Sequence, residues 1–383
     1  MSYVPESIWP RLKVDGVLYG LPNMNVAGKY NIIYRKDWLD NLEKEVPTTM
    51  DEFTEVMRAF TEDDPDQNGV NDTYGYGNYG MQMFYGMFGG APGFYHVNGD
   101  GKIEIGSVSE GYKNALMYYK ELYDKKYVDP EALTQKGEQF WQKMAQGKIG
   151  SWVGWWSEYH APWQSYDFAN TQPGGDLITT LPVSGPDGKT GMVAADPLGS
   201  VCGISYQVEN LDPILRFIEW AMGDEGYRTM KYGVEGTYYE MDGDEVAWIY
   251  IYDAERKSRS GTTAGDMEVY SMFSRMDVYT ELLRGDTIEQ MASIRGFTQA
   301  VENPLLEDAF LGINTPDFQS LMPDITKYVD EMRINFILGN ESFDNWDAYV
   351  NEYIRLGGLQ VAESMLVEYN RMYGIEATLA ISE

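Results

Sequence analysis

The sequence predicts an α/β protein with two domains. Short segments with the pattern of β-strands alternate with amphipathic helical segments along the chain, and this alternation is typical of α/β folds. The chain has 383 residues, which exceeds the size that one ordinary hydrophobic core supports. Hydrophobic residues make up 43% of the sequence, so we expect a globular protein rather than a disordered one.

Capping signals and apolar spacing predict the helices of the first half. Thr49 and Glu52 form a capping box, and the apolar residues that follow keep helical spacing up to an acidic loop that begins at Asp64. A second helix is predicted from about residue 110 to residue 126, with its aromatic and aliphatic residues on one side.

Turn residues predict the strands. A hairpin is expected over 95–105 around the turn Asn98-Gly-Asp-Gly101. A short helix over 138–146 is predicted to end at Gly147 and to lead into a strand over 149–153. Residues 176–208 contain further strand-like segments that glycine and proline interrupt.

The sequence pattern of the last part of the chain predicts helices. Asp212 is predicted as the N-cap of a helix with Pro213 in its first turn. Three further helices are expected, each ending at or before a glycine; they cover 321–338, 343–356 and 359–373, with Gly339, Gly357 and Gly374 after them.

Composition excludes several classes of partner. Sixty acidic residues against 29 basic ones give a formal net charge of −31, which argues against binding nucleic acid or an anionic membrane and favours neutral solutes. The only cysteine, Cys202, lies in an apolar run and is expected to be a small buried residue. No disulfide framework or thiolate metal cluster is possible within the chain.

The N-terminus shows no basic region followed by an apolar stretch, and no run of 18 apolar residues occurs. By itself this predicts a soluble chain without a signal peptide or a membrane span. Enzyme signatures are also missing: the sequence has two histidines, no His-x-x-x-His pair, no Gly-x-Ser-x-Gly elbow and no phosphate-binding loop.

The loop that begins at Asp64 is predicted to bind calcium. Oxygen-bearing side chains alternate along it, and Gly69 supplies a sharp turn. Calcium takes 6–8 oxygen ligands in a flexible cage. The twelfth position, where an EF-hand has a bidentate glutamate, is Gly75, so the loop is EF-like but incomplete; a solvated acidic turn is the alternative. The predicted ligands are Asp64, Asp66, Asn68, the carbonyl of Val70, and Asp72.

Aromatic residues are the candidates for ligand contact. Sugars present apolar faces and hydroxyl edges, so a sugar site needs flat rings together with amides or carboxylates. Five large rings fall within twelve positions: Trp152, Trp155, Trp156, Tyr159 and Trp163. The strand pattern favours Trp152 as a core residue. Beyond Gly154 the backbone is expected to leave the strand, so that Trp155 or Trp156 projects into a cleft.

The order of these motifs resembles that of the extracellular solute-binding proteins of bacterial carbohydrate ABC importers, especially the larger lipoprotein type with a calcium loop. The motifs are Asp15-Gly-Val-Leu-Tyr-Gly-Leu-Pro22, Tyr34-Arg-Lys-Asp-Trp-Leu39, the acidic loop, Gly147-Lys-Ile-Gly150 with Gly154-Trp-Trp156, and Tyr232-Gly-Val-Glu-Gly236. The resemblance covers nearly the whole chain.

The resemblance implies a two-lobed periplasmic-binding-protein-like fold with discontinuous lobes. Lobe 1 would comprise residues 1–28 and 183–310, and lobe 2 residues 29–182 and 311–383, with crossings near 22–30, 181–198 and 308–316. Such proteins carry a signal peptide and further βα units before the segment that begins here. The resemblance therefore implies an N-terminal truncation that leaves lobe 1 incomplete.

The resemblance also implies the ligand contacts. Trp156 matches the family's sugar-stacking tryptophan, and Trp155 and Tyr79 are further candidates; ordinary core or surface packing is the alternative for each. Asn23 and Asn25 on the first crossing would bind hydroxyls or only shape a turn. Glu235 would accept a hydroxyl hydrogen bond from lobe 1 or make a structural bond.

The resulting hypothesis is a monomeric protein, not an enzyme, that binds a neutral carbohydrate and delivers it to ABC permease subunits. The resemblance implies an extracellular or periplasmic location, with a lipid anchor on the full-length protein, and a structural rather than ligand-binding Ca²⁺. Two alternatives remain: a glycosidase or lyase that uses a carboxylate pair, and an adhesive or structural calcium module.

Overall fold

The computed structural model describes residues 4–6, 8–14, 16–24, 27–77, 80–159, 162, 167–232, 234–237, 239–243, 245–248, 251–253, 258–260, 295–296 and 298–380. Two compact units make up the chain. Unit 1 comprises Met1–Ala27 and Asp196–Ile294, and unit 2 comprises Gly28–Ala195 and Arg295–Glu383. Each unit is described by itself below.

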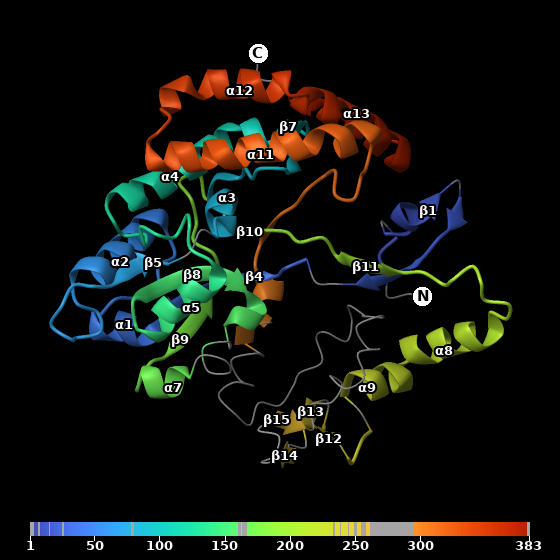
Figure 1. The fold of residues 1–383 in the computed structure, drawn as a ribbon, viewed down its shortest axis with the longest axis horizontal. Helices are drawn as coiled ribbons and strands as arrows, with labels where there is room; N and C mark the ends of the chain where they lie inside the picture. The colour runs from blue at the N-terminus through green and yellow to red at the C-terminus, as the bar shows by residue number, and fades with distance from the viewer. Residues whose placement is uncertain are drawn as a thin grey trace. The chain divides into compact units, whose positions relative to one another are not determined.

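Unit 2 contains a four-stranded sheet in the order β5-β8-β4-β9. Its strands are β4 (Tyr30–Arg35), β5 (Tyr74–Tyr76), β8 (Ile149–Trp155) and β9 (Leu177–Thr180). β4 runs antiparallel to β8 and β9, whereas β5 is parallel to β8. β8 is buried up to its last residue, Trp155, so the sheet has helices on both faces along most of its length (Figure 1).

Helices in the first half of unit 2 share its main hydrophobic core with C-terminal residues such as Phe336 and Trp346. These helices are α1 (Lys36–Asn41), α2 (Met50–Glu62), α3 (Gln82–Phe88) and α4 (Glu110–Asp124). The predicted capping box at the start of α2 is confirmed, because Thr49 accepts from the Glu52 N–H and Glu52 reaches back to the Thr49 N–H. Rings from these helices and from β5 meet edge to face in this core: Phe53, Tyr76, Phe84 and Tyr119.

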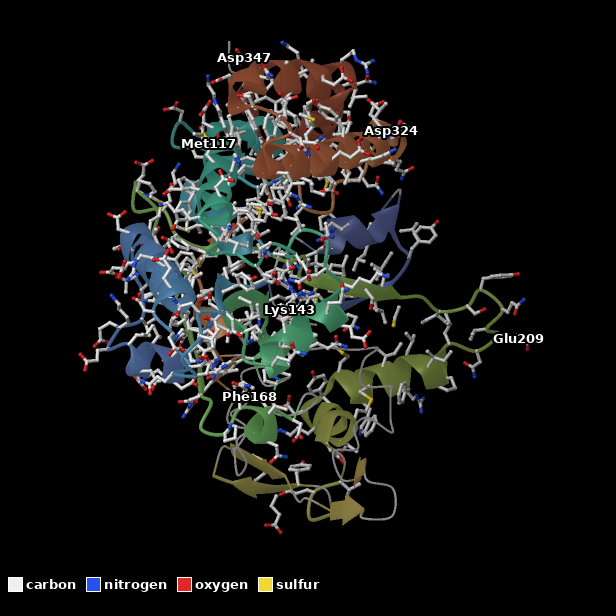
Figure 2. The ribbon with its side chains drawn as sticks, turned by 60° about the vertical axis from the view of Figure 1, so that its left-hand side comes forward. Met117, Lys143, Phe168, Glu209, Asp324 and Asp347 are labelled. Carbon is white, nitrogen blue, oxygen red and sulfur yellow. The ribbon has the colours of Figure 1, made fainter. Side chains whose placement is uncertain are left out.

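The helices α5 (Gly137–Ala145) and α7 (Phe168–Thr171) complete this half of unit 2. Trp152 of β8 is fully buried against Phe140 and Trp141 of α5, with ring centroids 5.8 and 6.1 Å apart. Lys143 lies on the same helix (Figure 2). It forms an ion pair of 2.6 Å with the buried carboxylate of Asp129. The prediction that Trp152 is a core residue is confirmed.

The predicted hairpin and the three C-terminal helices are present. β6 (Tyr95–Val97) and β7 (Ile103–Ile105) form a small sheet with β17 (Leu379–Ala380). The helices are α11 (Pro316–Leu338), α12 (Trp346–Arg355) and α13 (Gly358–Tyr373), and the glycine after each of α11 and α13 has a positive φ, 75° and 65°. α11 begins five residues before the predicted position because the Thr315 hydroxyl caps it.

The predicted lobe boundaries at 182 and 310 differ from the division into units. β10 (Met192–Val193) pairs in parallel with β16 (Leu305–Leu306), and both belong to unit 2. Phe310 and Ile313 are buried in the core of unit 2. The chain therefore passes between the units at Ala27/Gly28, Ala195/Asp196 and Ile294/Arg295, so the third passage precedes the predicted crossing near 308–316.

The part of unit 1 that the structure describes contains small sheets, the 3-10 helix η1 (Trp9–Leu12) and two α-helices. β3 (Leu21–Met24) pairs with β11 (Leu198–Cys202), and α8 (Asp212–Met222) packs on α9 (Asp224–Tyr232). Short two-stranded ladders complete its described part: β1 (Lys13–Val14) with β2 (Val17–Leu18), β12 (Tyr239–Asp242) with β13 (Glu245–Trp248), and β14 (Ile251–Asp253) with β15 (Ser258–Ser260).

Two single-residue expectations for unit 1 need correction. Asp212 is the first residue of α8 and Leu211 is its N-cap, because the Asn210 side chain already accepts the Asp212 N–H at 3.1 Å. Cys202 is half-buried rather than a fully buried core residue. Within the described ranges of the whole chain, every helix is too short or too polar to cross a bilayer.

Candidate functional site

The end of β8 presents the exposed tryptophan of the predicted site. The strand continues to Trp155, two residues beyond its predicted end, because Trp155 still pairs with Tyr30 of β4. The indole of Trp155 is 52% exposed. The ammonium group of Lys29 lies 5.6 Å from the centroid of its ring, a cation–π distance. Trp155 is therefore held at one side by the sheet while much of its surface stays open.

Trp156 turns the chain out of the sheet. It begins the 3-10 helix η3 (Trp156–Glu158), it is half-buried, and its N–H donates to the carbonyl oxygen of Lys29 at 2.8 Å. A Cβ atom placed on Gly296 would lie 2.6 Å from the Trp156 carbonyl oxygen. Glycine at this position thus allows the later segment of unit 2 to lie directly against the Trp156 backbone.

Glu158 ends the 3-10 helix that follows Trp155. Its carboxyl group lies over Gly154, where a Cβ atom would come within 2.1 Å of Oε2. Burial raises the pKa of Glu158 to about 7, and a hydrogen bond from the Trp155 backbone N–H opposes this rise only in part. A buried carboxyl with few partners favours its neutral form.

The other predicted ligand contacts are placed as follows. Asn23 lies in β3 of unit 1, where its Nδ2 donates to the Ser200 hydroxyl at 3.1 Å. Glu235 is exposed in a turn of unit 1 and forms an isolated bridge with Tyr239. Asn25 and Tyr79 lie outside the described residues. Since Trp155 and Trp156 belong to unit 2, the assembly of these residues into one site stays a prediction.

The sequence reasoning did not anticipate Lys29 and Glu158. Lys29 directly precedes β4, and its proximity to Trp155 follows from the register of β4 with β8, which local patterns do not reveal. Glu158 stands in the aromatic run itself, so a carboxylate among five aromatic rings was the available signal.

The acidic loop after α2 is closed by its own hydrogen bonds. The carboxylate of Asp64 accepts the backbone N–H groups of Asn68 and Gly69 at 3.1 and 2.9 Å. The Asn68 amide donates to Asp66 at 2.9 Å, and its oxygen accepts the Val70 N–H. Asp64 and Gly69 both have positive φ, 49° and 86°, so the loop curls tightly around its oxygens.

One buried side-chain oxygen of this loop is a candidate ligand for a cation. Asp66 Oδ1 is buried and has no hydrogen-bond partner, and burial together with the nearby Asp64 and Asp72 carboxylates raises the pKa of Asp66. An unpaired buried carboxylate oxygen costs free energy that a bound cation would recover. Asp72 instead pairs with Lys148. In the described ranges no three His, Cys, Asp or Glu side chains form a metal-binding group, so amide and carbonyl oxygens would have to contribute.

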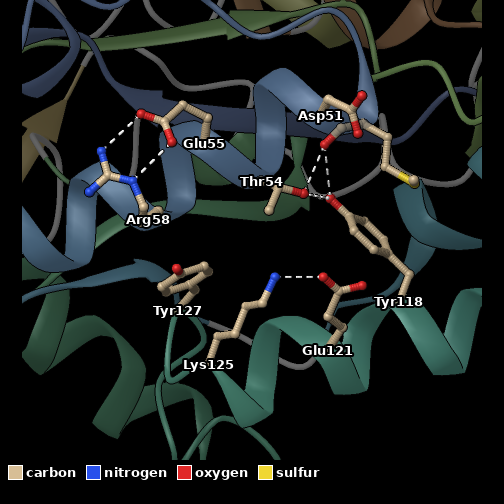
Figure 3. Close-up of a pocket in the computed structure, with 9 residues that line it drawn as sticks. Asp51, Thr54, Glu55, Arg58, Tyr118, Glu121, Lys125 and Tyr127 are labelled. Atoms are coloured by element: carbon tan, nitrogen blue, oxygen red, sulfur yellow. Dashed lines mark hydrogen bonds and ion pairs between the residues drawn. The ribbon is translucent and has the colours of Figure 1, made fainter.

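Unit 2 also contains two surface hollows away from the tryptophans. A hollow of about 350 Å³ lies between α2 and α4, and several charged side chains that line it are paired with one another, as in Glu55 with Arg58 and Lys125 with Glu121 (Figure 3). The arginine lowers the pKa of Glu55 to about 2. A groove of about 1290 Å³ lies between the β6–β7 hairpin, residues 305–309 and α12.

Comparisons with known proteins identify the family. The family model described as bacterial extracellular solute-binding protein matches residues 3–228. The chain is 26% identical over 364 residues to the polygalacturonan/rhamnogalacturonan-binding protein YtcQ of Bacillus subtilis strain 168, across 91% of this chain and 70% of that protein. It is 27% identical over 173 residues to the fructooligosaccharide ABC transporter substrate-binding protein FusA of Streptococcus pneumoniae serotype 4, across 43% of this chain and 30% of that protein.

Solved structures confirm the predicted fold class. The structure of S. pneumoniae FusA in complex with kestose matches 96% of this chain and 79% of its own, with a TM-score of 0.69 and 17% identity. An EF-hand mutant of FusA in complex with fructo-nystose matches 97% and 79%, with a TM-score of 0.67 and 16% identity. At these identities the likeness concerns the fold alone.

Proposed function

Because the chain belongs to the bacterial extracellular solute-binding protein family, we propose that it binds a neutral carbohydrate and delivers it to the permease subunits of an ABC importer. The names of two relatives, one binding polygalacturonan or rhamnogalacturonan and one binding fructooligosaccharides, support a saccharide as the ligand. The net charge of −31 favours a neutral one.

The exposed indole of Trp155 is the observation that carries this proposal. Most large rings of unit 2 are buried in its core, whereas Trp155 is 52% exposed at the end of a buried strand. A flat ring held by a rigid sheet suits the apolar face of a sugar. Trp156 and Tyr79 would extend this surface, and Asn23, Asn25 and Glu235 would bind hydroxyls from unit 1 as the two lobes close on the ligand.

No covalent chemistry is part of the proposal. Isothermal titration calorimetry of the chain against a panel of neutral oligosaccharides tests it, with product analysis of the same mixtures. Saturable binding without cleavage supports the solute-binding function. Steady release of shortened sugars would instead establish a glycosidase or lyase, and binding of no sugar would reject the carbohydrate claim.

Calcium fits the acidic loop as a structural ion. Asp64, Asp66, Asn68 and the Val70 carbonyl would hold it, and Asp72 would join them after release from Lys148. The ion would neutralise the buried Asp66 oxygen and stiffen the connection between α2 and β5. An EF-hand is named for one structure of similar fold. The proposed location is extracellular, with a lipid anchor on the full-length protein, and the proposed state is a monomer.

A further inference from the structure

Two buried asparagine side chains of unit 2 are hydrogen-bonded to backbone groups close to Trp155 and Trp156. Asn31 of β4 is 0% exposed and Asn303 is 4% exposed. Asn303 Nδ2 donates to the Asn31 side-chain oxygen at 3.2 Å and to the Tyr30 carbonyl oxygen at 2.8 Å. Asn31 Nδ2 in turn donates to the carbonyl oxygen of Gly296 at 2.7 Å. These bonds join residues about 270 positions apart in the sequence.

The amides act on the backbone that carries the tryptophans. The Tyr30 carbonyl oxygen accepts a hydrogen bond from Asn303 Nδ2, and Tyr30 is the strand partner of Trp155. The Gly296 carbonyl oxygen accepts a hydrogen bond from Asn31 Nδ2, and Gly296 lies against the Trp156 carbonyl. Lys29, next to Tyr30, accepts the Trp156 N–H. The backbones of Trp155 and Trp156, which carry the two indoles, are thus next to backbone groups that the amide pair holds.

The hydrogen bonds of this pair fix the position of the later segment on β4 more than they increase the free energy of unfolding. A buried hydrogen bond contributes little net free energy, but leaving one partner unpaired is costly. Amides at these positions therefore exclude arrangements in which Gly296 and Asn303 shift along β4. Gln299 adds a further constraint, because its Nε2 donates to Asn303 Oδ1 at 3.1 Å and so fixes which way the Asn303 amide points.

We propose that Asn31 and Asn303 are positioning residues that set the orientation of Trp155 and Trp156 for ligand stacking. The pair also connects two points at which the chain enters unit 2, after Ala27 and after Ile294. The consequence for affinity rests on the proposed carbohydrate function; the consequence for the tryptophan geometry does not.

The test compares three single variants. Asn303→Leu keeps the side-chain size and removes its hydrogen bonds. Gln299→Leu removes only the bond that orients Asn303, so it remains informative if Asn303→Leu fails to fold. Asn370→Leu is the matched control, because the Asn370 amide also makes two side-chain bonds, to the backbone of Ala377, but lies on α13.

Two measurements are made on each variant. Fluorine NMR of protein labelled with 5-fluorotryptophan reports every indole, and the Trp155→Phe and Trp156→Phe variants assign the two relevant resonances. Calorimetry gives the affinity for the oligosaccharide that the unmodified chain binds best.

The proposal expects the Trp155 and Trp156 resonances to move in Asn303→Leu and, to a lesser extent, in Gln299→Leu, while the buried Trp38 and Trp152 keep theirs. Affinity should fall about tenfold in Asn303→Leu, and Asn370→Leu should change neither readout. Unchanged Trp155 and Trp156 resonances, or equal movement in the control, would overturn it. If no sugar binds any variant, the carbohydrate function fails and the fluorine spectra still decide the positioning role.

Discussion

Replacing Glu158 by glutamine is expected to stabilise the protein at alkaline pH and to leave it unchanged in acid. The substitution keeps the shape of the side chain over Gly154 and retains an oxygen that can accept the Trp155 N–H. It removes only the ability to ionise. The effect therefore isolates the cost of burying this one carboxylate.

The sign follows from the raised pKa. Burial raises the pKa of Glu158 from an ordinary 4.5 to about 7, so the folded state holds a proton that the unfolded state has already released. Stability from this group is fully present below pH 4.5 and is lost as pH rises through 7. A pKa difference of about 2.5, at about 1.4 kcal/mol for each unit of pKa, gives roughly 3 kcal/mol as an upper limit.

The assay is thermal unfolding followed by circular dichroism at pH 4, 5, 6, 7 and 8. Glu158→Gln should match the unmodified chain at pH 4 and unfold several degrees higher at pH 8. Glu209→Gln is the control, since Glu209 is exposed in the loop before α8 (Figure 2). A Glu158→Gln curve parallel to that of the unmodified chain at every pH would refute the reasoning, as would destabilisation at pH 8.

Three other outcomes are expected. Millimolar calcium should raise the melting temperature of the unmodified chain above that of an EDTA-treated sample. At a calcium concentration 100 times the dissociation constant, the free energy of unfolding should increase by about 3 kcal/mol. Asp66→Ala should abolish the difference, and identical melting curves of the unmodified chain with and without calcium would remove the calcium claim. Thr49→Ala should cost about 1 kcal/mol through loss of the α2 cap, measured by urea unfolding, and no loss would show that the cap is dispensable. Gly296→Ala should weaken sugar binding in calorimetry, because its Cβ would displace the Trp156 carbonyl; unchanged affinity would mean that the backbone adapts without cost.

Local signals in the sequence predicted the helices and the hairpin well. The Thr49 capping box, the turn at Asn98 and the glycines after α11 and α13 act over a few residues, so adjacent sequence is sufficient to recognise them. The alternation of faces along β8 correctly placed Trp152 in the core.

Contacts between distant segments were beyond such reasoning. The end of β8 at Trp155 depends on pairing with Tyr30. The passages between units at Ala195/Asp196 and Ile294/Arg295 depend on the pairing of two-residue strands at 192–193 and 305–306. The amide pair of Asn31 and Asn303 has no local signature at all, since each residue is an ordinary asparagine in its own segment. Most of the candidate site therefore becomes visible only when β4 and β8 come together with Gly296 and Asn303.

The central claim is that a carbohydrate stacks on the tryptophans at the end of β8. Calorimetry with the best-bound oligosaccharide should show affinity reduced at least tenfold in Trp155→Ala and in Trp156→Ala. Trp220→Ala, which removes another exposed indole on α8, should bind as the unmodified chain does. Full affinity in both Trp155→Ala and Trp156→Ala would contradict the account.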